Sequence, residues 1–232
     1  MEAQLFSTQE LIAYIKSFPW KRKILQLHIH HTWKPNHNDY NGKNGFELQK
    51  AMRNYHVNTN HWKDIGQHLT LLPDGKWITG RDFNLDPASI EGWNQGAFAI
   101  EMIGNFDIGR DKFGGAQADA MFEFCAAFIV DRNLDIKTDV KFHRDNPKAG
   151  KSCPGSSINR ENFFMQMAKT ICLLQNPKTP SDEWKIKEID YLASVGIIND
   201  PEGWKKKVNE PMPVWAAITI MSNIFKKLQN QG

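Results

Sequence analysis

The segment 142–155 places an imidazole, His143, and a thiol, Cys153, ten residues apart. Pro147 and Gly150 lie between them, so we predict a loop rather than a helix. A loop can fold back and bring both side chains to one point, and imidazole and thiolate are both good zinc ligands. A catalytic zinc ion usually takes three protein ligands, so the fold has to bring a third one from elsewhere in the chain.

The short apolar run 23–32 offers the best position for that third ligand. It reads as a buried strand that contains His28, His30 and His31 near its end. Alternation along a strand puts His28 and His30 on one face and His31 on the other. Polar groups at the end of a central strand are well placed for a site. His68 is a further candidate, and the residues alone do not choose among these four histidines.

Helix-like and strand-like segments alternate along residues 1–175. The spacing of apolar residues predicts helices at 7–18, 45–55, 117–133 and 158–174. Residues 7–10 have the form of a capping box, which would start the first of these helices. Short apolar runs predict strands at 23–32, 65–72, 76–81, 97–104 and 139–142. This order indicates an α/β (mixed α+β) fold, with a single central mixed β-sheet flanked by helices.

Glu101 interrupts the apolar run 97–104. A carboxylate in a buried strand must be paired, protonated or functional, because burying it alone is costly. Glu101 is therefore a candidate for acid–base chemistry.

The cysteines and the charge balance narrow the class of protein. Cys125 and Cys172 sit in apolar runs and are predicted to be free core thiols, which suits synthesis in a reducing compartment. The net charge is only +3 and the one basic run is 205–207, so we expect no nucleic-acid partner. We find neither a signal peptide nor a run long enough to insert in a membrane, and expect a protein made in the cytoplasm that acts after release.

The chain beyond residue 175 differs in pattern. Residues 176–182 read as a linker and residues 183–232 as a small helical C-terminal unit, with helices at 184–195 and 214–228. Two short helices bury little on their own, so we expect them to dock or to form a homodimer. Parts of the unit, 191–198 and 213–217, also resemble half of a surface-layer-homology module, a type of module that binds cell-wall polymers.

Five short motifs follow one another in residues 1–175. They are 29–32, 64–68, 75–81, 100–106 and 143–154. Together they resemble the type 2 N-acetylmuramoyl-L-alanine amidases, a family that includes phage lysozyme-amidases, bacterial cell-wall amidases and peptidoglycan recognition proteins. The resemblance spans roughly residues 20–172.

The resemblance implies a zinc site and two catalytic residues. The family's ligands fall on His30, His143 and Cys153, its catalytic glutamate on Glu101 and its catalytic lysine on Lys151. Zinc lowers the pKa of its water to about 7 and polarises a carbonyl. Glu101 is expected to transfer the proton of the water, and Lys151 to stabilise the oxyanion.

Two positions depart from the family pattern. Gln67 stands where members without the glutamate often carry a catalytic tyrosine, and Ser89 stands where some relatives have a histidine. Glutamine cannot act as an acid or base, so the first departure shifts the catalytic load to Glu101 and Lys151. The second departure affects substrate contacts rather than the metal site. The expected substrate-side residues are His68, Gln67, Arg81, Trp93 and Asn94.

The resulting hypothesis is zinc-dependent hydrolysis of the bond between N-acetylmuramic acid and L-alanine in peptidoglycan, by a phage or prophage endolysin. The alternatives are a cytosolic muropeptide-recycling amidase and a peptidoglycan-binding module without catalysis. A cysteine hydrolase that uses Cys153 and His143 is a further reading.

Overall fold

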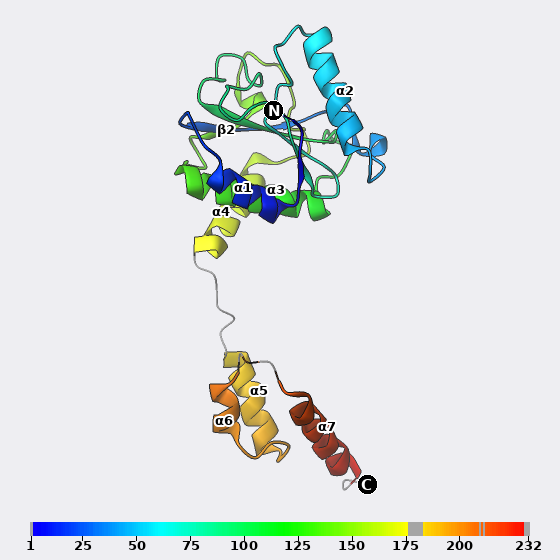
Figure 1. Ribbon diagram of the computed structural model, residues 1–232, viewed down its shortest axis with the longest axis vertical. Helices are drawn as coiled ribbons and strands as arrows, with labels where there is room; N and C mark the ends of the chain where they lie inside the picture. The colour runs from blue at the N-terminus through cyan, green and yellow to red at the C-terminus, as the bar shows by residue number, and fades with distance from the viewer. Residues whose placement is uncertain (1, 176–182, 209, 211, 230–232) are drawn as a thin grey trace. The chain divides into compact units, whose positions relative to one another are not determined.

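The computed structural model describes residues 2–175, 183–208, 210 and 212–229. The chain divides into two compact units, Met1–Asn176 and Pro177–Gly232, each of which is described by itself (Figure 1). The predicted linker, 176–182, lies outside the described residues.

The first unit is built on a six-stranded mixed sheet. Its strands follow the order β1 (Leu5–Phe6), β4 (Trp77–Thr79), β3 (Leu69–Leu71), β5 (Ala97–Met102), β2 (Gln26–His31) and β6 (Val140–Phe142). Strands β3, β5, β2 and β6 are parallel to one another, while β4 and β1 pair antiparallel at one edge. The predicted mixed sheet is confirmed.

Helices cover both faces of this sheet. They are α1 (Thr8–Ser17), α2 (Gly45–Asn58), α3 (Gly115–Arg132) and α4 (Arg160–Gln175). In Figure 1, α1, α3 and α4 gather on one side of the sheet and α2 lies on the other. The capping box predicted at the first helix is present, with Ser7 and Glu10 bonded reciprocally.

The two faces of the sheet have separate hydrophobic cores, and the side chains of β2 alternate between these faces. Leu27 and Ile29 point into the larger core, beneath α1, α3 and α4. His28 and His30, at alternate positions, turn to the other face, where their rings lie 6.3 Å apart. The predicted alternation of this strand is confirmed. It places His30 on the face away from the larger core, where a site can form.

Several details differ from expectation. Strands β3 and β4 have three residues each, fewer than the predicted runs 65–72 and 76–81. Before β3, Gly66 N–H bonds outside the sheet, to His56 Nδ1. Cys125 is buried as predicted, but Cys172 is exposed. Helix α4 buries Phe163 and Met167, which lie one turn apart on one face of the helix. Cys172 does not lie on that face.

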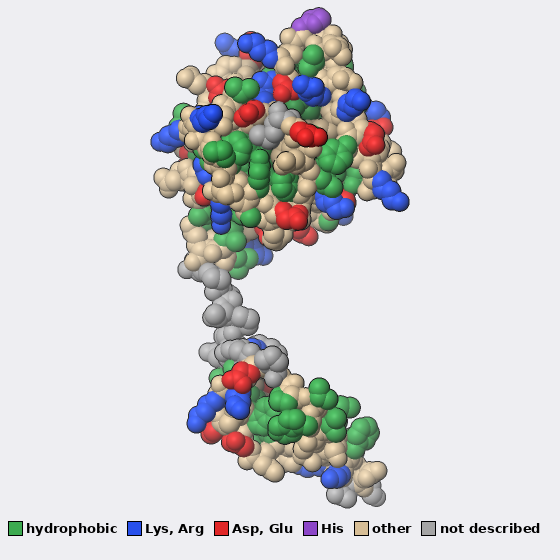
Figure 2. Space-filling view, viewed as in Figure 1, with side chains coloured by type: hydrophobic (Ala, Val, Ile, Leu, Met, Phe, Trp, Pro, Cys, Tyr) green, Lys and Arg blue, Asp and Glu red, His purple; other side chains and the backbone are tan. Residues whose placement is uncertain are grey.

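The second unit contains α5 (Glu183–Ser194), α6 (Pro201–Lys206) and α7 (Val214–Gln229). Helix α6 was not predicted; it is a short helix that Asp200 caps and Pro201 starts. Within the described residues of this unit, the buried apolar side chains are those of Ile197, Ile198 and Ala216. Hydrophobic side chains gather on the surface of the unit in Figure 2. No helix in the described part of the chain is long and apolar enough to span a bilayer.

Candidate active site

The site lies where parallel strands of the first unit end. His30 on β2 pairs directly with Glu101 on β5, and β6 on the other side of β2 leads straight into His143. Carboxyl ends of parallel strands meet at one edge of a sheet, where ligand sites of open α/β sheets form. Strand register therefore places these three side chains together.

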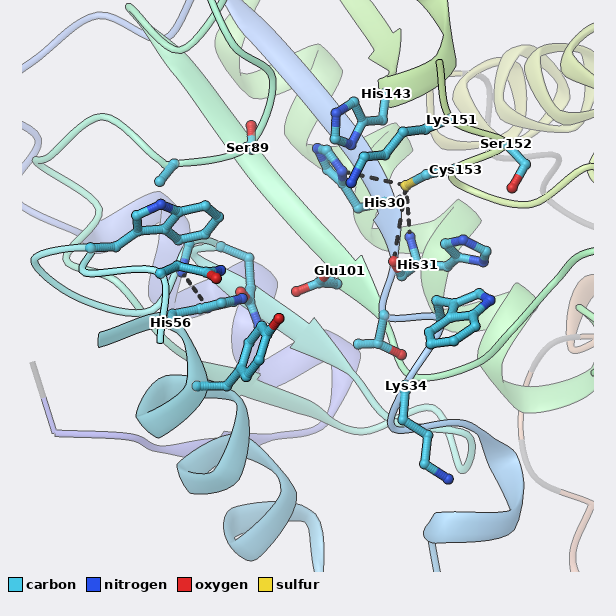
Figure 3. A pocket seen from close by; sticks show the side chains of 18 of the residues that line it. His30, His31, Lys34, His56, Ser89, Glu101, His143, Lys151, Ser152 and Cys153 are labelled. Carbon is cyan, nitrogen blue, oxygen red and sulfur yellow. Dashed lines mark hydrogen bonds between the residues drawn. The ribbon is translucent and has the colours of Figure 1, made fainter. Parts of the chain in front are cut away.

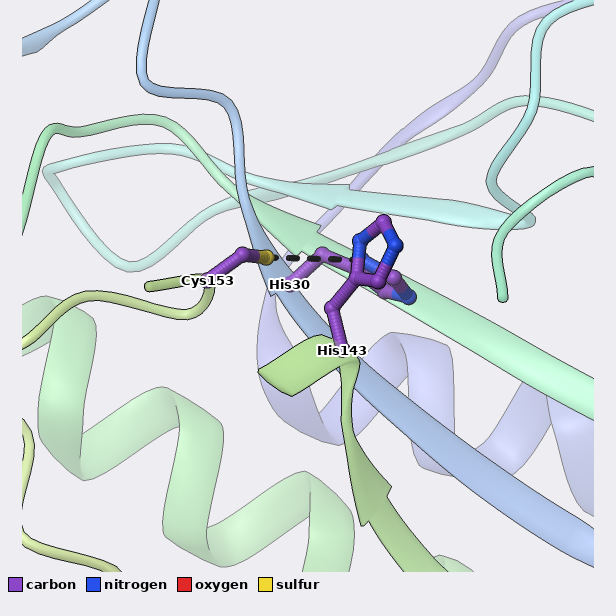
Figure 4. Close-up of side chains that lie close together, drawn as sticks. All are labelled: His30, His143 and Cys153. Atoms are coloured by element: carbon purple, nitrogen blue, oxygen red, sulfur yellow. Dashed lines mark hydrogen bonds between the residues drawn. The ribbon is translucent and has the colours of Figure 1, made fainter. Parts of the chain in front are cut away.

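The loop after β6 completes the group with Cys153. The ligand atoms of His30, His143 and Cys153 all lie within 4.8 Å of one another. The rings of the two histidines are 4.9 Å apart, and Cys153 Sγ is 3.5 Å from His30 Nδ1 (Figure 4). In the part of the chain that the structure describes, this is the one such group of possible metal ligands. Of the four candidate histidines, the fold brings His30 to the loop.

Arg144 holds this loop in place. Its backbone N–H donates to the carbonyl of Cys153 at 2.9 Å, and its guanidinium donates to the carbonyl of Gly155 at 2.7 Å. The guanidinium also lies over the Phe142 ring, 5.0 Å from its centre. The backbone N–H of His31 contacts Cys153 Sγ at 3.4 Å. Sequence reasoning missed the role of Arg144, which only the folded path of the loop reveals.

The donor set fits a zinc ion. His30 Nε2 is buried and has no hydrogen-bond partner, so the imidazole has capacity that the protein itself does not use. Burial raises the pKa of Cys153 to about 12 and lowers that of His30 well below its usual value. A cation at this point favours the thiolate and the neutral imidazole, the forms that ligate zinc.

Two further groups face the ligands. Desolvation raises the pKa of Glu101 to about 8. Burial and then the charge of Lys151 lower the pKa of His143, which indicates that the ammonium lies close to the ligands. Figure 3 shows Lys151 extending toward His30 and His143, with Glu101 between these ligands and His56.

All five predicted ligands and catalytic residues line one cavity of about 980 Å³. That volume is in the range of sites for small molecules or parts of larger ones. Its other wall was not predicted; it includes Trp33, Lys34, Tyr55, His56 and Trp62. The His56 and Trp62 rings lie 4.7 Å apart. The only sign of this wall in the sequence is the aromatic content of two loop-like stretches.

Among the predicted substrate-side residues, Gln67 lines the cavity and the other four do not. His68 is fully buried: its Nδ1 accepts from the backbone N–H of Ala99 and its Nε2 donates to the carbonyl of Leu85, both at 2.9 Å. Its ring stacks on Phe98, with centroids 4.5 Å apart. His68 thus has the contacts of a structural residue, and its substrate role stays a prediction.

Arg81, Trp93 and Asn94 are also engaged by the protein. The Arg81 guanidinium donates to the carbonyls of Ile65, Asp64 and Asp86. Lys141 lies over the Trp93 ring at 5.4 Å. Asn94 Oδ1 accepts from the backbone N–H groups of Ser89 and Ile90. These side chains fix the loop before β5, and their predicted contacts with substrate stay untested.

Ser89 lies at the edge of the cavity and contacts a second histidine. Its hydroxyl is 2.7 Å from His28 Nδ1, and His28 Nε2 is 3.1 Å from Gln26 Oε1. Burial lowers the pKa of His28 to about 3. His28 is therefore neutral, and both of its ring nitrogens have hydrogen-bond partners, whereas Nε2 of His30 has none.

Comparisons with known proteins agree with the motifs. A family model described as N-acetylmuramoyl-L-alanine amidase matches residues 20–156. The N-acetylmuramoyl-L-alanine amidase of Homo sapiens is 29% identical over 89 residues, which cover 36% of this chain and 16% of that protein. Peptidoglycan-recognition protein SC2 of Drosophila simulans is 26% identical over 113 residues, covering 48% and 59%. The chain thus spans less than two thirds of the length of these relatives.

Solved structures share the fold. A mutant of Drosophila PGRP-LB in complex with tracheal cytotoxin superposes with a TM-score of 0.53 at 23% identity, over 61% of this chain and 81% of that one. The amidase LysC from Clostridium intestinale gives 0.51 at 22% identity, over 66% and 94%. Since the family model matches more than half of the 232 residues, the chain belongs to the N-acetylmuramoyl-L-alanine amidase family.

Proposed function

We propose that this protein is a zinc-dependent N-acetylmuramoyl-L-alanine amidase, which hydrolyses the amide bond between N-acetylmuramic acid and L-alanine in peptidoglycan. The observation that carries the proposal is the group of His30, His143 and Cys153, whose ligand atoms lie within 4.8 Å of one another, with Glu101 paired directly opposite His30. Membership of the amidase family supports the same reaction.

Each residue has a role that follows from its place. His30, His143 and Cys153 would hold the zinc ion, which when bound supplies Lewis-acid polarisation of the carbonyl and acidifies water. Glu101 takes the proton of the attacking water and passes it to the departing nitrogen, because a carboxyl group can accept and donate a proton in turn. The Lys151 ammonium faces the negative charge that develops on the carbonyl oxygen.

The cysteine-hydrolase reading fits less well. A nucleophilic cysteine has a lowered pKa and an accessible sulfur. Cys153 is buried, and its pKa is raised to about 12 by that burial. This reading also leaves His30 without a function, although its imidazole faces the same sulfur.

The direct test combines metal analysis with mass spectrometry of the products from purified walls. We expect one zinc per chain, new N-terminal alanine on the stem peptides, and loss of both on chelation. Cys153→Ala is expected to lose the metal. Release of alanine that chelators do not affect would refute the zinc mechanism.

We further propose that the protein acts on intact walls as an endolysin, made in the cytoplasm and acting after release. The separate C-terminal unit, with its likeness to wall-binding modules, supports this role. A turbidity assay on walls distinguishes it from a recycling amidase, which cleaves soluble muropeptides and leaves walls intact. A binding module without catalysis retains walls in a pull-down but releases no alanine.

The C-terminal unit is also proposed to form a homodimer. Helix α7 exposes apolar side chains at intervals of four, three, four and three residues, the spacing of a helix–helix seam: Val214, Ile218, Met221, Phe225 and Leu228. The opposite side of the helix buries Ala216 in its own unit. Sedimentation equilibrium tests this: we expect a dimer that Ile218→Ser with Phe225→Ser converts to a monomer. A monomeric wild type contradicts it.

A further inference from the structure

Two buried side-chain polar atoms lack a hydrogen-bond partner within the described residues: His30 Nε2 and Gln67 Oε1. Both residues line the same cavity. Buried polar atoms in folded proteins are nearly always paired, so each exception needs an explanation. His30 already has a task as a ligand of the proposed zinc site, whereas the proposed chemistry gives no task to the amide oxygen of Gln67.

A chain of buried hydrogen bonds determines which end of that amide is paired inside the protein. Gln49 Nε2 donates to the carbonyl of Thr79 at 3.2 Å, so Gln49 Oε1 is available as an acceptor. The Thr70 hydroxyl donates to this oxygen at 2.6 Å. Having given its single proton, the hydroxyl accepts from Gln67 Nε2 at 2.9 Å. Gln67 therefore uses its nitrogen inside the protein and leaves its oxygen, which can only accept, buried and unpaired in the cavity wall.

This chain stands next to the catalytic residues. Thr70 pairs with Glu101 across β3 and β5, and Glu101 pairs with His30 across β5 and β2. Glu101 is thus flanked by the zinc ligand on one side and by the anchor of Gln67 on the other. Neighbouring strands lie about 4.8 Å apart, so both flanks are within reach of one bound peptide.

We propose that Gln67 orients the substrate, its Oε1 accepting a hydrogen bond from one of the first two amide N–H groups of the stem peptide, that of the cleaved bond or the next one. The inference rests on the proposed amidase function. An N–H group can only donate, so it requires an acceptor, and a neutral one pairs with it without burying a charge. Thr70 is then a positioning residue, because its hydroxyl accepts from the Gln67 nitrogen and so leaves the oxygen as the unpaired end of the amide.

The test measures binding to zinc-free protein, which leaves the substrate uncleaved. Titration calorimetry gives the dissociation constant of a soluble muramoyl peptide and of two analogues, in which oxygen replaces the first or the second amide N–H of the stem. We expect one analogue to bind the wild type about 10- to 100-fold more weakly than the amide, because the Gln67 oxygen is again unpaired. Gln67→Leu is expected to bind that analogue and the amide equally.

Matched variants separate this role from a structural one. Gln117 is as buried as Gln67, but its amide bonds to the carbonyls of Leu71 and Ile103, and it lies outside the cavity. Gln117→Leu should keep the discrimination between amide and analogue. Thr70→Val should weaken the discrimination and Thr70→Ser should restore it, which also tests the idea if Gln67→Leu does not fold.

Two results overturn the proposal: equal affinity of the wild type for the amide and both analogues, or a discrimination that persists in Gln67→Leu. Either can occur while the wild type still releases alanine from walls, which leaves the amidase function intact. A wild type that neither binds the muramoyl peptide nor releases alanine instead refutes the proposed function, and this inference with it.

Discussion

His30 and His68 are both buried imidazoles beside the central strands, yet their surroundings differ. His68 has a partner for each ring nitrogen, the backbone N–H of Ala99 and the carbonyl of Leu85, and it stacks on Phe98. His30 faces a thiol with one nitrogen and has no partner for the other. The protein itself provides partners for both ring nitrogens of His68. It leaves one ring nitrogen of His30 without a partner.

The pKa values do not make this distinction. Burial is the main cause of a lowered pKa at both residues, to about 3 for His68 and well below the usual value for His30. Perturbed pKa values mark functional sites and structural networks alike. The two histidines differ in the hydrogen-bond partners of their ring nitrogens and not in the direction of their pKa shifts.

The largest expected effect comes from replacing His30, the histidine with an unpaired ring nitrogen. His30→Ala should reduce bound zinc from one per chain to none and activity to background, since zinc needs all three protein ligands. The fold should persist, because the substitution removes the 3.5 Å contact between His30 Nδ1 and Cys153 Sγ and no hydrogen bond at Nε2. Metal analysis and circular dichroism check both points. A variant that keeps one zinc per chain excludes His30 as a ligand.

Glu101→Gln tests the residue opposite His30. We expect kcat to fall about 10²- to 10⁴-fold with zinc still bound, because an amide cannot transfer the proton. Steady-state kinetics and metal analysis measure the two quantities. Activity within a few-fold of wild type removes Glu101 from the mechanism.

The same variant has a signature in stability against pH. In zinc-free protein the pKa of Glu101 rises from 4.5 to about 8, so between these values the folded state holds a proton that the unfolded state has lost. The free energy of unfolding contributed by Glu101 therefore falls as pH rises, by up to about 1.4 kcal/mol per unit, and levels off above pH 8. Denaturant unfolding of wild type and Glu101→Gln should diverge over this window. Parallel curves contradict the assignment.

The smallest expected effect comes from replacing His68, the histidine whose two ring nitrogens both have partners. His68→Leu leaves the backbone groups of Ala99 and Leu85 unpaired, which should lower the free energy of unfolding by about 1–3 kcal/mol. Zinc content and kcat of the folded variant should match the wild type. A selective rise in KM with unchanged stability would instead favour the substrate role predicted for His68.

Sequence patterns predicted the parts that local rules control. Alternation assigned His30 and Ile29 to opposite faces of β2, and capping chemistry marked the start of α1. The choice of His30 over His28 required family resemblance, because both lie on the same face. Residues of the other cavity wall, such as Trp33 and Trp62, come from loops whose paths depend on tertiary contacts, and no local period marks them.

The register of β2 also determines when the site can form. His30 and Cys153 are 123 residues apart in sequence, and closing such a long loop is a slow step in folding. Before the central strands pair, the chain offers only the two ligands of its own loop, His143 and Cys153. At the proposed zinc site, complete binding of the metal therefore requires an assembled sheet, and the rate at which refolding protein takes up zinc is expected to depend on that assembly.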